Sequence, residues 1–126
     1  MSNPESEEVI AVLAQFGIDY NDALRRMAGN AELYKKLTKH YAADENYIGF
    51  VEAMAQNDLD AAYAHVHTLK GVAGNLSFNT LYDLASQAGV ALRSDAPEEA
   101  RALIDALGEA DKNARAGLEY WESISL

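Results

Sequence analysis

Apolar residues recur at helical spacing, in steps of mostly three, four or seven, along nearly the whole chain. The pattern predicts a short helix that ends near Gly17 and a second short helix from Asp19 to Gly29. Longer helices are predicted from about residue 31 to 56 and from 59 to 76. Two further helices are expected around Leu81–Leu92 and Leu103–Trp121.

Two of the longer helices carry well-defined apolar stripes. The expected stripe of the 31–56 helix consists of Leu33, Leu37, Tyr41, Ile48, Val51 and Ala55, and that of the 59–76 helix of Ala62, Val66, Leu69, Ala73 and Leu76. No segment alternates apolar and polar residues as a strand would. We therefore predict one all-α domain over residues 1–126. Residues 31–121 form an antiparallel up-down four-helix bundle, and short helices that include residues 1–16 flank it.

Capping residues and glycines give further information on where these helices begin and how closely they pack. Asp95, followed by Pro97 and by Glu98 three residues on, predicts a capped helix start. Three glycines, Gly89, Gly108 and Gly117, lie inside predicted helices, where each costs roughly 1 kcal/mol relative to Ala. They indicate either close helix contacts or misplaced helix boundaries.

Composition narrows the classes of function. The chain has 126 residues, no Cys, 10 basic and 20 acidic side chains, and a net charge of -10. The absence of Cys excludes disulfides and thiolate sites, and the negative charge disfavours nucleic acid and anionic membranes as partners. No apolar run is long enough to span a membrane, and the acidic N-terminus, Met1 to Glu5, lacks a signal-peptide pattern. We expect a cytoplasmic monomer.

One face of the 59–76 helix gathers residues that suit phosphoryl chemistry. At 100° per residue, His67, Lys70, Gly71 and Gly74 lie opposite the apolar stripe. A neutral imidazole is a good nucleophile near pH 7, and a Lys one turn away can neutralise part of a phosphoryl group. The glycines leave room for another protein to approach the ring. His65 points away from His67, so the pair cannot bind one metal ion, and we interpret His65 as structural.

The run His67-Thr68-Leu69-Lys70-Gly71 resembles the motif of histidine-containing phosphotransfer (HPt) domains. The resemblance extends from about Gly17 to Leu92, with further matches at Gly17-Ile18-Asp19, Gly29-Asn30 and Glu32-Leu33-Tyr34. It implies a four-helix bundle that exposes the phosphorylated histidine in the middle of a helix.

The resemblance also implies a function and a set of roles. His67 would accept a phosphoryl group from a receiver-domain aspartate and pass it to a second receiver. Lys70 would stabilise the phosphate, and Gly71 and Gly74 would provide access. Receiver domains of hybrid kinases and response regulators would be the partners. The Mg²⁺ would belong to the receiver, with no cofactor or metal bound by this chain. The chain would be a phosphocarrier and not an enzyme.

Two positions depart from the family pattern. Many members have Gly where this chain has Ser77, after Leu76. Some members place Gln or Glu on the next helix to hydrogen-bond the acceptor ring, and the matching position here is Gly89, which has no side chain to do so.

Two alternative functions stay open on the sequence. The chain could be the phosphoacceptor domain of a chemotaxis-type histidine kinase, since those domains also carry a His-x-x-Lys-Gly pattern. It could also be a helical adaptor that keeps the fold without the chemistry, although intact His67 and Lys70 argue against that.

Overall fold

A computed structural model describes residues 5–124. The expectation that the N-terminus is no signal peptide rests largely on residues 1–4, which lie outside the described residues. Within that range the chain is helical, and its one β-bridge, between Ile18 and Phe78, is isolated. The helices are α1 (Glu7–Gln15), α2 (Tyr20–Arg26), α3 (Ala31–Tyr41), α4 (Asn46–Ala55), α5 (Leu59–Leu76), α6 (Asn79–Arg93), α7 (Pro97–Ala102) and α8 (Ile104–Ile124). None of these helices is long and apolar enough to cross a membrane.

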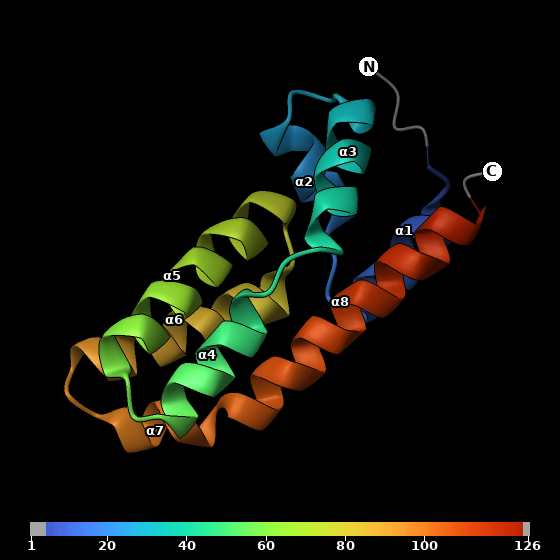
Figure 1. The fold of residues 1–126 in the computed structure, drawn as a ribbon. Helices are drawn as coiled ribbons and strands as arrows, with labels where there is room; N and C mark the ends of the chain where they lie inside the picture. Colours follow the sequence, from blue (N-terminus) through green and yellow to red (C-terminus); the bar gives the residue numbers. More distant parts are fainter. Residues whose placement is uncertain (1–4, 125–126) are drawn as a thin grey trace.

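The helices form a bundle in which α4, α5, α6 and the first half of α8 run side by side (Figure 1). The short helix α7 closes the end of the bundle where α6 turns into α8. At the opposite end, α1 lies along the second half of α8, and α2 and α3 pack near the end of α5. The predicted all-α bundle with short N-terminal helices is therefore confirmed.

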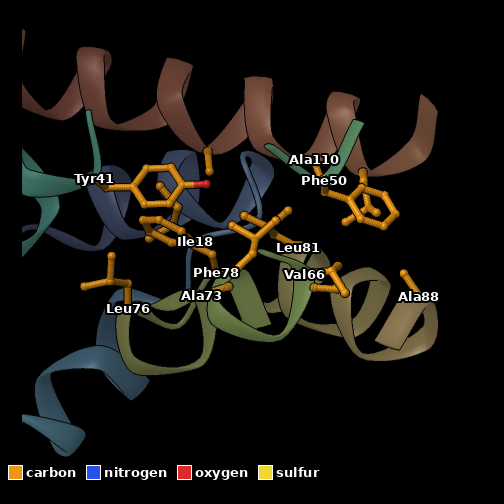
Figure 2. Packing of buried hydrophobic residues seen from close by; sticks show 14 of the residues in the cluster. Ile18, Tyr41, Phe50, Val66, Ala73, Leu76, Phe78, Leu81, Ala88 and Ala110 are labelled. Atoms are coloured by element: carbon orange, nitrogen blue, oxygen red, sulfur yellow. The ribbon is translucent and has the colours of Figure 1, made fainter. Parts of the chain in front are cut away.

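The core lies between α5 and α6 on one side and α4 and α8 on the other. Figure 2 shows Val66, Ala73 and Leu81 directed from α5 and α6 toward Phe50 and Ala110. All five residues of the stripe predicted for the 59–76 helix are buried. Because this stripe faces inward, the opposite face of α5 is directed to solvent.

The predicted continuous helix from 31 to 56 is wrong, because the chain breaks between Tyr41 and Asn46 into α3 and α4. The Asp44 carboxylate accepts a hydrogen bond from the Asn46 amide at 2.8 Å and so starts a new helix. Across the bundle, Arg115 donates to the backbone carbonyls of Ala42 and Asp44, at 3.1 and 2.8 Å. These contacts satisfy the carbonyl groups that the break exposes.

The break also overturns half of the stripe predicted for this segment. Leu33 and Ile48 are 39% and 56% exposed, and Ala55 is exposed as well. Of the other predicted residues, Tyr41 is buried, and Leu37 and Val51 are half-buried against the core. The buried positions that the pattern missed are Tyr34 and Thr38 on α3 and Phe50, Ala53 and Met54 on α4. A single helical register could not describe the two segments, because each helix presents its own face to the core.

The start predicted near Asp95 is partly wrong. The N-cap residue of α7 is Ala96, with no side-chain cap, and Asp95 has a left-handed backbone with φ of 56°. Pro97 does occupy the first turn, as predicted. The helix is only six residues long, and α8 begins separately at Ile104. The predicted signal at Pro97 therefore marks a short connecting helix before the last long one.

The N-terminal segment docks on the turn between α5 and α6. The amide of Asp19 donates to the Ser77 carbonyl at 2.9 Å, and the amide of Asn79 donates to the Gly17 carbonyl at 3.0 Å. The buried Tyr34 hydroxyl donates to the Leu76 carbonyl at 2.7 Å. Together these bonds satisfy backbone groups at the C-terminal end of α5 and hold α2 and α3 near that end.

Ser77 stands in this turn at the position where the resemblance to HPt domains leads one to expect glycine, and its side chain forms a hydrogen bond there. Its φ is 59°, a left-handed conformation, and its hydroxyl donates to the Asp22 carboxylate at 2.7 Å. We expect Ser77→Ala to lower the free energy of unfolding by about 2 kcal/mol, because the strain stays and the bond is lost. Ser77→Gly should cost about 1 kcal/mol less, since glycine relieves the strain. Urea unfolding of both variants measures the difference, and equal losses would contradict it.

Asp22 makes the stability of this corner depend on pH. Hydrogen bonds from Arg26, and then from Ser77, lower the pKa of the Asp22 carboxyl from 3.8 to about 2. A carboxyl whose pKa is lower in the folded protein stabilises the fold at pH values above its unfolded-state pKa. That stabilisation is lost as the pH falls through the folded-state pKa. We therefore expect this part of the stability to disappear between about pH 4 and pH 2. Asp22→Asn should weaken the dependence of the unfolding free energy on pH between about pH 4 and pH 2. An unchanged dependence would contradict the assignment.

Candidate functional site

His67 lies on the solvent face of α5, near the middle of the helix. Its neighbours Val66 and Leu69 are fully buried, whereas the His67 side chain is exposed. The helix starts cleanly because the Asp58 carboxylate accepts a hydrogen bond from the Ala61 amide at 3.1 Å. The regular backbone therefore presents the imidazole from a rigid element, as the sequence predicted from the apolar stripe.

Lys70 lies one helical turn beyond His67 and is half-buried. Among residues 5–124 no carboxylate lies within ion-pair distance of its ammonium group. The charge is thus available to an anionic group placed near the histidine ring.

The two glycines on this face have different surroundings. A Cβ atom built on Gly71 would meet no atom within 4 Å, so the helix surface beside His67 is open. A Cβ atom on Gly74 would lie 3.1 Å from Cδ1 of Tyr82, which belongs to α6 and is 37% exposed. Gly71 therefore borders open solvent, whereas Gly74 accommodates an aromatic ring at the edge of the same face.

Tyr63 contacts the His67 ring directly. The two rings are stacked with centroids 5.4 Å apart and planes inclined by 16°. The Tyr63 hydroxyl lies 3.4 Å from Nδ1 of His67. The sequence analysis did not single out Tyr63, although its place four residues before His67 puts both side chains on one face of the helix.

Tyr63 is itself fixed by α6. The Arg93 guanidinium carbon lies 4.3 Å from the centre of the Tyr63 ring, within cation–π range. A Cβ atom on Gly89 would lie 3.8 Å from Cε1 of Tyr63, an ordinary van der Waals distance, so the ring lies close to α6 at this position. Arg93 and Gly89 belong to the same helix and together define where the tyrosine ring lies.

The other two histidines take no part in this constellation. His65 is half-buried between α4 and α5, with Nδ1 3.3 Å from the Asn46 side-chain oxygen. A Cβ atom on Gly49 would overlap its ring, so this glycine makes room for His65. His40 is exposed near the end of α3. Across residues 5–124, no three acidic, histidine or cysteine side chains gather as a metal site would require.

Comparison with known protein families shows the family to which the chain belongs. A family model described as the Hpt domain matches residues 11–117. The chain belongs to the Hpt domain family. No curated protein matches the chain. No solved structure matches it either.

Hpt domains are phosphocarrier modules of phosphorelays, and they interact with receiver domains. Gly89, the position that the sequence analysis matched to the family's ring-binding side chain, lies on α6 and has no side chain. A side-chain hydroxyl does contact the His67 ring, and it comes from the same helix, at Tyr63. The sequence signal that could have found this contact is an aromatic residue four positions before His67.

Proposed function

We propose that His67 accepts a phosphoryl group from the phosphoaspartate of one receiver domain and passes it to the aspartate of a second. The observation that carries the proposal is the exposed imidazole in mid-helix beside the open surface at Gly71. A receiver can therefore bring its aspartate against the ring without displacing any side chain of residue 71. Membership of the Hpt family supports the same role.

The transfer balances without a cofactor on this chain. A ring nitrogen of His67 uses its lone pair to form an N–P bond, while the P–O bond to the receiver aspartate breaks and its electron pair leaves with the carboxylate. The reverse sequence at a second receiver regenerates the neutral ring. The Lys70 ammonium offsets negative charge on the phosphoryl oxygens. The Mg²⁺ belongs to the receiver, as in the family.

Phosphoryl transfer from a panel of labelled receiver domains tests the proposal. Label should appear on this chain, should be lost in acid and persist in base, and should be absent from His67→Gln. ATP alone should give no label. Labelling on Ser, Thr or Asp would overturn the assignment. Transfer only from a kinase ATP-binding domain would favour the chemotaxis-type alternative, and no transfer from any source would favour the adaptor.

Lys70→Ala should slow transfer about tenfold, because the phosphoryl group loses one charge-assisted contact. The free energy of unfolding should change by less than about 0.5 kcal/mol, since no partner of the ammonium is lost. Lys36→Ala on α3 is the matched control, because it removes the same charge from an exposed helical site. Rapid-quench transfer assays of both variants give the comparison. If both variants transferred at equal rates, Lys70 would be an ordinary solvated charge with no role in phosphoryl transfer.

A further inference from the structure

We infer that Tyr63 is the positioning residue for His67, a role that rests on the proposed phosphotransfer. In this role the hydroxyl oxygen accepts a hydrogen bond from Nδ1–H, the direction that attack by Nε2 requires, and the ring limits the orientation of the imidazole by stacking. The inference stands on the contact between the two side chains: parallel rings 5.4 Å apart and a hydroxyl 3.4 Å from Nδ1.

The 3.4 Å contact fits a hydrogen bond in either direction, because a hydroxyl can donate or accept, and the two directions have different chemical consequences. A neutral imidazole carries one ring proton, and the nitrogen without it is the nucleophile. A bond from Nδ1–H to the Tyr63 oxygen favours the tautomer that leaves the lone pair on Nε2. Tyr63 therefore selects Nε2 as the attacking nitrogen, even though an unconstrained histidine prefers to protonate that atom.

The same contact strengthens as the reaction proceeds. When Nε2 forms the N–P bond, Nδ1 keeps its proton and the ring gains positive charge. The charged ring is a better donor to the Tyr63 oxygen, so the bond is stronger in the transition state than in the resting protein. The 3.4 Å separation in the unphosphorylated protein leaves room for this shortening, as is common for bonds in resting active sites.

The support for Tyr63 comes from α6. Arg93 lies against the tyrosine ring, and α6 passes beside the ring at Gly89. Gly89 lies opposite Tyr63 in the antiparallel α5–α6 pair. Arg93 is one turn further along α6, so it reaches the Tyr63 ring from the side nearer the start of α5, away from His67. The tyrosine ring is thus confined between the guanidinium and the imidazole, which limits the rotamers available to it.

Tyr63→Phe tests the inference, because it keeps the ring and removes only the hydroxyl. Long-range ¹H–¹⁵N spectra of the unphosphorylated protein report which ring nitrogen of His67 carries the proton. We expect a predominant Nδ1–H tautomer in the unmodified chain and at least a twofold smaller share of it in Tyr63→Phe. At saturating receiver, transfer should slow by about fivefold, roughly the difference between a hydrogen bond to a charged ring and one to a neutral ring, with an unchanged half-saturating concentration. Tyr63→Ala, which also loses the stacking, should be slower still.

Tyr120→Phe is the matched control, since it removes a tyrosine hydroxyl from α8, away from the face of α5 that carries His67, and its spectra and rates should equal those of the unmodified chain. A Tyr63→Phe protein with an unchanged tautomer and an unchanged rate would overturn the inference. Weaker receiver binding with an unchanged tautomer would also overturn it, because Tyr63 would then be a docking residue. An unmodified chain that accepts no label would instead overturn the proposed function, while the tautomer measurement would still decide whether Tyr63 orients the ring.

Discussion

Gly71→Gln should reduce phosphoryl transfer from a receiver by at least about tenfold while the protein remains folded. The side chain of a helical residue leans toward the preceding turn, so a Gln at position 71 would extend over the His67 ring. No atom lies within 4 Å of a Cβ at this position, so the substitution meets no steric obstacle inside the protein. Rapid-quench transfer rates over a range of receiver concentrations measure the effect, which should arise mainly from weaker docking.

Gly71→Ala distinguishes the effect of residue 71 on receiver access to His67 from its effect on the free energy of unfolding. Its free energy of unfolding should rise by up to about 1 kcal/mol, since alanine favours the helix and the new methyl group enters open space. Its transfer rate should fall between those of the unmodified chain and Gly71→Gln. If Gly71→Gln transferred at the unmodified rate, the access role would be refuted. If it unfolded, Gly71 would be a packing residue.

Gly117→Ala should have the opposite effect on stability and destabilise the protein by about 2 kcal/mol, despite the same gain in helix propensity. Gly117 is buried in α8, against the turn between α1 and α2. A Cβ atom there would lie 2.7 Å from Cβ of Phe16 and 2.9 Å from Cδ1 of Ile18. Because Cβ of Phe16 is attached directly to the backbone, the turn itself would have to move. Thermal and urea unfolding measure the loss.

Gly71→Ala is the natural control for Gly117→Ala, because both replace a mid-helix glycine by the same residue. Opposite changes in unfolding free energy would show that the surroundings, and not the helix propensity, determine the cost of each glycine. Gly117→Leu should be more destabilising than Gly117→Ala, since its larger side chain cannot fit beside Ile18. A stabilised Gly117→Ala protein would contradict the close packing described for α8.

The fold could be predicted where local signals and burial agree. The stripe of α5, its Asp58 cap and its end at Leu76 all follow from the residues themselves. The break between α3 and α4 has only a weak local signal, because Ala42 and Ala43 are good helix formers and Asp44 alone favours a new helix start. What favours the break is a contact made by Arg115, which is distant in sequence. The helical pattern placed Gly71 on an exposed face, but it left open whether Gly117 marked a close helix contact or a misplaced boundary, and the structure shows the close contact.

The candidate site was predictable to the extent that it lies on one helix. His67, Lys70 and Gly71 share a face because of their spacing alone, and that face is exposed because the opposite one is apolar. Two features depend on α6 and could not be inferred from α5: the Tyr82 ring over Gly74 and the Arg93 group on Tyr63. Tyr63 itself was within reach of the helical pattern, since it lies one turn before His67.

The docking of the N-terminal segment on the turn at Ser77 bears on how the chain folds. The bonds from Asp19 to Ser77 and from Asn79 to Gly17 close loops of about sixty residues, whereas α4, α5 and α6 pack against their immediate neighbours in the chain. Loop closure of this length costs entropy, so contacts between sequence neighbours form first. We expect α4 to α6 to assemble early, and α1 and α2 to open and close as a separate unit of lower stability. Amide hydrogens around His67 would then exchange only on global unfolding, and the helix that carries His67 would persist through such partial openings.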